Sequence, residues 1–175
     1  MSASSSPSQS ETAHSFALHS VADVDRLTTD AQISGKPIQS LQISSKIALL
    51  KFCSLPSAFV DAFCSSALTQ LHLKAFVPGV GLRIREPFGH EGMRALMHCF
   101  QYLSSLQQLN LSLNRLGAEG AMALASLASS LQHLSSLQQL DLNGNGINAE
   151  RAIALASSFR HFAISLQQLN FSSRS

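Results

Sequence analysis

Charged and aromatic side chains are scarce in this chain of 175 residues. It has no tryptophan and one tyrosine, 13% of its residues are charged, and its formal net charge is +2. Nucleic-acid-binding surfaces are built from clustered lysine and arginine, so this nearly neutral composition argues against a nucleic-acid partner. The chain also lacks any run of about 18 apolar residues. We therefore expect no membrane-spanning helix and no membrane partner.

Cysteine is rare as well, and its spacing forms no motif. Cys53, Cys64 and Cys99 are odd in number, contain no Cys-x-x-Cys pair and lie among apolar neighbours. We predict that all three are buried apolar side chains in a reducing compartment, and that they bind no metal. The serine-rich N-terminus lacks the basic start and apolar stretch of a secretory signal, which favours a cytoplasmic location.

Motifs for catalysis and cofactor binding fail at decisive positions. The segment His90–Arg94 begins like a zinc-protease helix, but Arg94 stands where the second histidine is needed. Gly79 and Gly81 begin a phosphate-binding pattern, but Ile84 replaces its third glycine. We therefore expect no catalytic, metal-binding or cofactor-binding residues and no enzymatic activity.

The prominent feature of the chain is an internal sequence repeat. The segment Ser104–Leu111 returns 31 residues later as Ser135–Leu142, and again after 29 residues as Ser165–Phe171. A period of this length indicates tandem supersecondary units that bury their apolar faces against one another. Leu109 and Leu111 alternate with a polar residue, which predicts a short strand in each unit. Apolar residues at helical spacing in 121–127 and 152–159 predict a helix after it.

This unit resembles the leucine-rich repeat, with the pattern LxxLxLxxNxL followed by GxxxL, in the long helical subtype of ribonuclease inhibitor. Ala-Leu-Ala at 123–125 and 154–156 also resembles bacterial GALA-type repeats. The resemblance implies an α/β solenoid of about four repeats, with a parallel sheet on the concave side and helices on the convex side. It also implies structural roles for Asn114 and Asn145, whose amides would turn inward and bond backbone groups of neighbouring turns.

The same pattern predicts how the chain is organised. Residues 1–15 are expected to be a disordered serine-rich tail and 16–175 a single repeat domain. Within that domain we predict a capping helix at 16–30, divergent repeats at 38–67 and 68–105, clear repeats at 106–136 and 137–165, and a truncated repeat at 166–175. In the divergent repeats Lys46 and Phe76 replace the asparagine, and 57–67 is the expected helix of the first. The last strand is expected to leave a sheet edge open, which indicates either a fragment of a longer array or self-association.

Two surfaces are candidates for partner binding. One is the polar concave face, and the other is the long segment after Leu73, whose basic residues favour an acidic protein. The candidate residues are His72, Lys74, Arg83, Arg85, Gln108, Asn110, Gln139, Asp141, Gln168 and Asn170. The alternative interpretations are that the concave face is a merely solvated sheet surface and that the long segment is an eroded repeat packed on the core.

Three functional classes remain open at this point. The first is a non-enzymatic scaffold that binds another protein. The second, implied by the GALA resemblance, is a bacterial effector secreted into a host cell or a ubiquitin-ligase adaptor, since Leu55 to Cys64 faintly resembles an F-box helix. The third is a GTPase-activating protein similar to those acting on Ran, which share the repeat subtype. We favour the scaffold.

Overall fold

A computed structural model describes residues 14–65, 67–73, 88–117, 122, 133–159 and 165–171 of the chain. Residues 1–13 of the predicted tail lie outside the described part, as do Lys74, Arg83 and Arg85. The predicted boundary of the tail at residue 15 is wrong, because Ser15 opens a β-strand and the carbonyl of His14 accepts hydrogen bonds from the backbone of Gln39 and Ser40.

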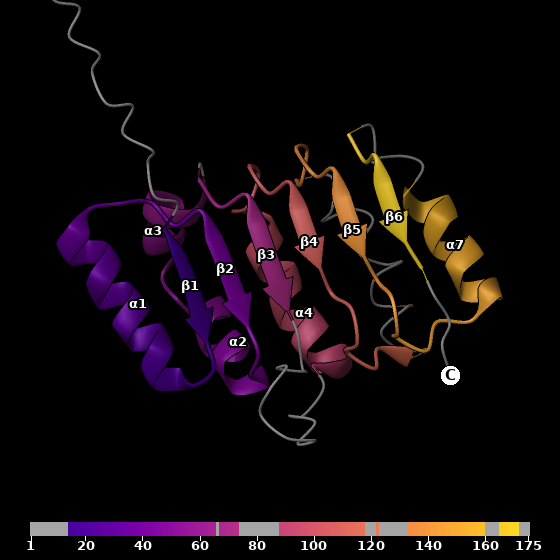
Figure 1. Cartoon of the computed structure of the whole chain (residues 1–175), viewed down its shortest axis with the longest axis horizontal. Coiled ribbons are helices and arrows are strands. Elements are labelled where there is room, and N and C mark those ends of the chain that lie inside the picture. The colour runs from indigo at the N-terminus through magenta and orange to yellow at the C-terminus, as the bar shows by residue number, and fades with distance from the viewer. Residues whose placement is uncertain are drawn as a thin grey trace, which may run out of the picture.

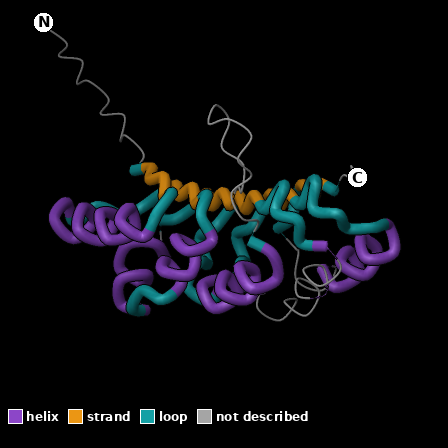
Figure 2. The backbone as a smooth tube through the Cα atoms, turned by 90° about the horizontal axis from the view of Figure 1, so that it is seen from below, coloured by secondary structure: helices purple, strands orange, loops and turns teal. Residues whose placement is uncertain are grey.

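Six strands form one sheet in which each strand pairs in parallel with the next one along the chain (Figure 1). They are β1 (Ser15–Leu18), β2 (Ser40–Ile43), β3 (Gln70–Leu73), β4 (Gln108–Asn110), β5 (Gln139–Asp141) and β6 (Gln168–Asn170). The described helices all lie on one face of this sheet, and we call the face that carries none of them the open face (Figure 2). The predicted α/β solenoid of stacked strand and helix units is confirmed, with one strand more than the sequence indicated.

Leucine alternation sets the register of the sheet. Leu41, Leu71, Leu109 and Leu140 are partners in neighbouring strands, and each is at most 2% exposed. Side chains of successive strand residues point to opposite faces, so each leucine faces the helices and its polar neighbours face the open side. The buried leucines join into one continuous core that runs the length of the described units.

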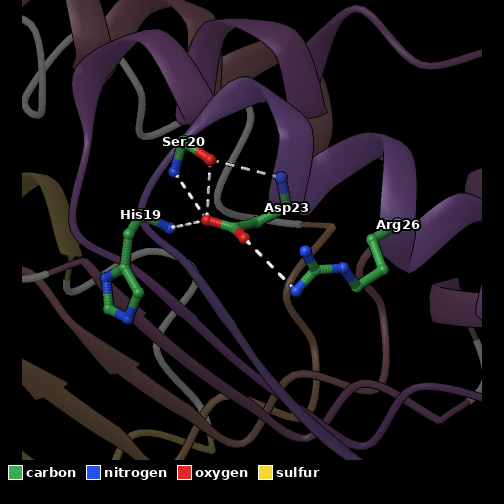
Figure 3. Close-up of polar contacts among 4 residues, drawn as sticks. All are labelled: His19, Ser20, Asp23 and Arg26. Atoms are coloured by element: carbon green, nitrogen blue, oxygen red, sulfur yellow. Dashed lines mark hydrogen bonds and ion pairs between the residues drawn. The ribbon is translucent and has the colours of Figure 1, made fainter.

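The N-terminal unit differs from the predicted capping helix. Residues 15–18 form β1, which pairs with β2, and helix α1 covers only Val21–Ser34. Ser20 ends the strand because its side chain accepts from the backbone N–H of Asp23, and Asp23 in turn accepts from the backbone N–H of Ser20 (Figure 3). This reciprocal capping box starts the helix at Val21. Gly35, in the left-handed conformation at φ 63°, ends it.

The second unit contains a helix that the sequence analysis missed. Helix α2 spans Lys46–Cys53 and is capped by Ser45, whose hydroxyl accepts from the N–H of Ala48. The helix expected at 57–67 is present as a short helix α3 (Ser57–Val60) followed by a π-helical turn (Asp61–Ser65). Lys46, at the asparagine position of the pattern, pairs with Glu91 in the first turn of helix α4 (Gly89–Phe100). The ion pair links two helices that also pack together.

The three cysteines lie on these N-terminal helices as free thiols. Cys64 and Cys99 are buried and Cys53 is half-buried. A hydrogen bond with Cys99 and burial raise the pKa of the Cys53 thiol, and burial raises the pKa of Cys64 to about 12. Thiols held in the protonated form are poor nucleophiles and poor metal ligands, and the described residues hold no cluster of three metal-binding side chains.

The C-terminal unit carries helix α7 (Ala149–Phe159), on which Leu155 is completely buried and Ile153 is 68% exposed. The helix predicted at 121–127 lies outside the described residues except for Met122. Among the helices that the structure describes, none has the length and apolar character needed to cross a membrane.

Candidate binding surface on the open face of the sheet

The open face carries two parallel rows of polar side chains, one on each side of the buried leucine row. We call the first the glutamine row, because Gln70, Gln108, Gln139 and Gln168 are partners across four strands. The second, the mixed row, consists of His72, Asn110, Asp141 and Asn170. All the described candidate residues of this face are therefore gathered into one surface, in which adjacent members are about 4.8 Å apart because that is the spacing of paired strands.

The two rows enclose a partly open hollow of about 100 Å³. Six polar residues and two leucines from four successive strands line it. The lining residues are His72, Gln108, Leu109, Asn110, Gln139, Leu140, Asp141 and Asn170. Six of the candidate residues named from the sequence therefore line a single depression. Of the candidates that the structure describes, Gln168 is the one that does not line it.

Short hydrogen bonds at the strand ends hold two members of the mixed row, Asn110 and Asp141, in place. Asn110 Oδ1 accepts from the backbone N–H of Ser112 at 3.0 Å and from its hydroxyl at 2.7 Å. Asp141 Oδ1 accepts from the backbone N–H of Asn143 at 2.9 Å. Each is a turn in which a side chain bonds the backbone two residues on. Both side chains are therefore oriented by their own strand ends before any partner arrives.

A second set of amides holds the turns below this surface. Asn114 Nδ2 donates to the carbonyls of Leu73 and Leu111, each at 2.8 Å. Asn145 Nδ2 donates to Leu111 and Leu142, and its Oδ1 accepts from the N–H of Asn114. Both asparagines are at most 1% exposed. They connect each turn to the one before it and so fix the distance between the β4 and β5 parts of the surface.

One outward-facing position departs from expectation. Strand alternation places the side chain of Ser44, the residue after β2, on the open face, yet Ser44 is fully buried. His19, its partner on the neighbouring strand end, covers it, and the ring Nδ1 lies 2.5 Å from the Ser44 hydroxyl. The polar surface therefore does not extend evenly to the N-terminal end of the sheet.

Two segments, residues 102–125 and 133–156, match a protein-family model described as Leucine Rich repeat. The chain contains leucine-rich repeats. The matched segments contain β4 and β5 together with Asn114 and Asn145, so the residues that fix the hollow belong to the regular repeats. No curated protein matches the chain.

These leucine-rich repeats contain a strained backbone segment that was not predicted from the sequence. Leu113 and Arg115 have φ values of 61° and 50°, in the left-handed region that favours glycine. The following repeat has Gly144 and Gly146 at the same places, with φ values of 68° and 67°. Comparing the two asparagine turns residue by residue would have revealed the requirement, because glycine on both sides of Asn145 indicates a left-handed backbone there.

Proposed function

We propose that the chain is a non-enzymatic scaffold that binds a protein partner on the open face of its sheet. Repeat solenoids present extended surfaces of this kind, and the variable exposed side chains select the partner. The observation that carries the proposal is that Asn110 and Asp141, at the centre of the mixed row, are already oriented by hydrogen bonds to their own strand ends. Side chains already held in position lose less conformational entropy when they bind than free ones do.

Site-specific cross-linking tests this proposal. A photo-reactive amino acid placed at Gln139, on the open face, should capture a protein from cells that express the full chain. Ile153 is the matched control, because it is 68% exposed on α7 on the opposite side of the sheet. Capture from position 139 and not from 153 supports open-face binding. Capture from position 153 alone would overturn it.

We also propose that the repeats belong to the long helical subtype, because of the lengths of the helices behind the sheet. Helices α1, α4 and α7 contain 14, 12 and 11 residues, which suits repeats similar to those of ribonuclease inhibitor. The proposed similarity to GALA-type repeats is supported by the Ala-Leu-Ala segment in α7. Leu155, the central residue of the second Ala-Leu-Ala, is fully buried, so this element serves packing in α7.

A cytoplasmic location is proposed for the scaffold, supported by the odd number and apolar surroundings of its cysteines. Delivery into a host cell as an effector or ubiquitin-ligase adaptor is the alternative, and the identity of the captured protein separates the two. Components of a ubiquitin ligase would support the adaptor, and a Ran-type GTPase would support a GTPase-activating role. A second copy of the chain would support self-association through the sheet edge.

A further inference from the structure

We propose that the hollow around Asp141 receives a basic side chain of the bound protein, with arginine the best fit. This inference rests on the proposed function, because it names the chemistry that the open face would recognise in its partner. It depends on three features of the hollow, which are its charge, the orientation of its carboxylate and its size.

The described residues that line the hollow include one carboxylate, that of Asp141, and no lysine or arginine. Asp141 is the one acidic residue in the glutamine and mixed rows, and His72 is the one other titratable residue there. Within the described part of the chain, the salt bridges join Asp23 to Arg26, Lys46 to Glu91 and Asp25 to Lys51, and none involves Asp141. A half-buried carboxylate bordered by amides and an imidazole favours an incoming cation.

One of the two carboxylate oxygens of Asp141 can accept a further hydrogen bond. Oδ1 is occupied by the backbone N–H of Asn143, whereas Oδ2 has a contact of 3.5 Å from Asn110 Nδ2. That distance is beyond the usual range for an N–H to oxygen hydrogen bond, so the contact is weak. The Asn110 oxygen is already used twice by Ser112. Among the described lining residues, Asp141 Oδ2 is therefore a charged acceptor with spare hydrogen-bonding capacity.

The size of the hollow favours a side chain over a cofactor. Its volume of about 100 Å³ is well below the roughly 300 Å³ at the lower end of sites for drug-sized ligands. A guanidinium head needs little room and presents five donors in a plane. It can pair with Oδ2 of Asp141 and still reach the side-chain oxygens of Gln108 or Gln139, which line the same hollow.

The test is an NMR titration of the full chain with small probes. N-acetyl-arginine amide is compared with N-acetyl-citrulline amide, which has nearly the same shape and no charge. The arginine probe should bind about tenfold more tightly than citrulline, as expected for one charged hydrogen bond, and should shift the amide signals of β4 and β5. N-acetyl-lysine amide should bind between the two.

Two variants make the test specific to Asp141. Asp141→Asn keeps an oxygen for the backbone N–H of Asn143 but removes the charge, and it should abolish the preference for arginine over citrulline. Asn170→Asp adds a second carboxylate to the mixed row and should increase that preference. Unchanged signals from Asn114 and Asn145 in both variants would show that the repeats remain folded.

Equal binding of arginine and citrulline by the unmodified chain would overturn the inference, as would an arginine preference that persists in Asp141→Asn. The scaffold itself is judged separately by cross-linking at Gln139. Capture of a protein there without any arginine preference would reject the basic anchor and leave the proposed function standing. No capture from the open face would reject both.

Discussion

The N-terminal strands of the sheet and the regular repeats satisfy the backbone groups that follow each strand in different ways. After β1 and β2 the chain enters a helix at once, with Ser20 and Ser45 as N-caps at equivalent positions. After β4 and β5 it makes an extended turn around a buried asparagine, Asn114 or Asn145. In both cases backbone groups at the end of a parallel strand need partners, because they can no longer bond along the sheet.

The difference determines how strongly neighbouring units are coupled. A capping serine bonds the backbone of its own helix, three residues on. An asparagine bonds carbonyls up to 41 residues away, in the preceding unit. All neighbouring units share the parallel pairing of their strands. Beyond that pairing, the N-terminal units are joined through helix packing and the pair between Lys46 and Glu91, whereas the regular repeats are joined through their turns.

Removing a buried asparagine should cause the largest loss in the free energy of unfolding. Asn145→Ala deletes three hydrogen bonds. It removes the side-chain partner of the Leu142 carbonyl and of the Asn114 N–H, whereas the carbonyl of Leu111 keeps the amide of Asn114 as a donor. At about 1 kcal/mol or more for each bond, we expect a loss of about 3 kcal/mol in the free energy of unfolding, measured by urea denaturation.

Hydrogen exchange should locate that loss in β4 to β6 and leave β1 and β2 protected. Asn143→Ala is the control, because residue 143 lies two positions before Asn145 in the same turn and takes part through its backbone N–H and carbonyl. An equal loss of protection in β1 would show that the two ends are not stabilised independently.

Removing the N-terminal cap should have a smaller and pH-dependent effect. Asp23→Ala breaks the capping box of α1, which is worth about 1 kcal/mol near neutral pH. Hydrogen bonds from the backbone N–H of His19 and from Ser20, together with Arg26, lower the pKa of Asp23 below 3.8 (Figure 3).

A lowered pKa stabilises the fold above the unfolded value and loses that contribution as pH falls through the folded value. The difference in melting temperature between the unmodified chain and Asp23→Ala should therefore be constant near neutral pH and shrink below pH 3.8. Asp30→Ala, an exposed change near the other end of α1, should not show this dependence. A difference that persists unchanged in acid would contradict the role of the Asp23 charge.

Relieving the strained turn should have the smallest effect and the opposite sign. A left-handed non-glycine residue costs about 1 to 2 kcal/mol, and glycine loses about 0.5 to 1 kcal/mol of backbone entropy on folding. Leu113→Gly should therefore stabilise the chain by about 0.5 kcal/mol, measured by thermal denaturation. Leu113→Ala, which retains the strain, should not.

The reverse substitution provides a check on the same turn. A Cβ atom at Gly144 would lie 2.5 Å from Leu113 Cδ2, and the φ of 68° adds strain. Gly144→Ala should be destabilising, and Leu113→Gly should rescue part of the loss. The absence of any rescue would show that the clash with Leu113 does not contribute.

The regular repeats could be predicted from the sequence, whereas the N-terminal unit was predicted wrongly. Residues from Leu106 onward repeat closely enough that the pairing of Gln108 with Gln139 and of Asn110 with Asp141 follows from alignment. The N-terminal unit was misjudged because Leu18, Val21, Val24 and Leu27 are spaced like one helical face. Leu18 in fact belongs to β1, and the signal that separates it from the helix, Ser20 followed by Asp23, is a local capping motif.

By itself the sequence determined the solenoid, because period and leucine alternation are properties of order along the chain. It also determined which polar residues share a row, since parallel strands in register place equivalent residues side by side. The tertiary structure decided that His19 contacts Ser44, that Lys46 pairs with Glu91, and that Asp141, with one weakly bonded carboxylate oxygen, lines a partly open hollow. These depend on contacts between units whose residues are far apart in the sequence, and no pattern within one unit encodes such contacts.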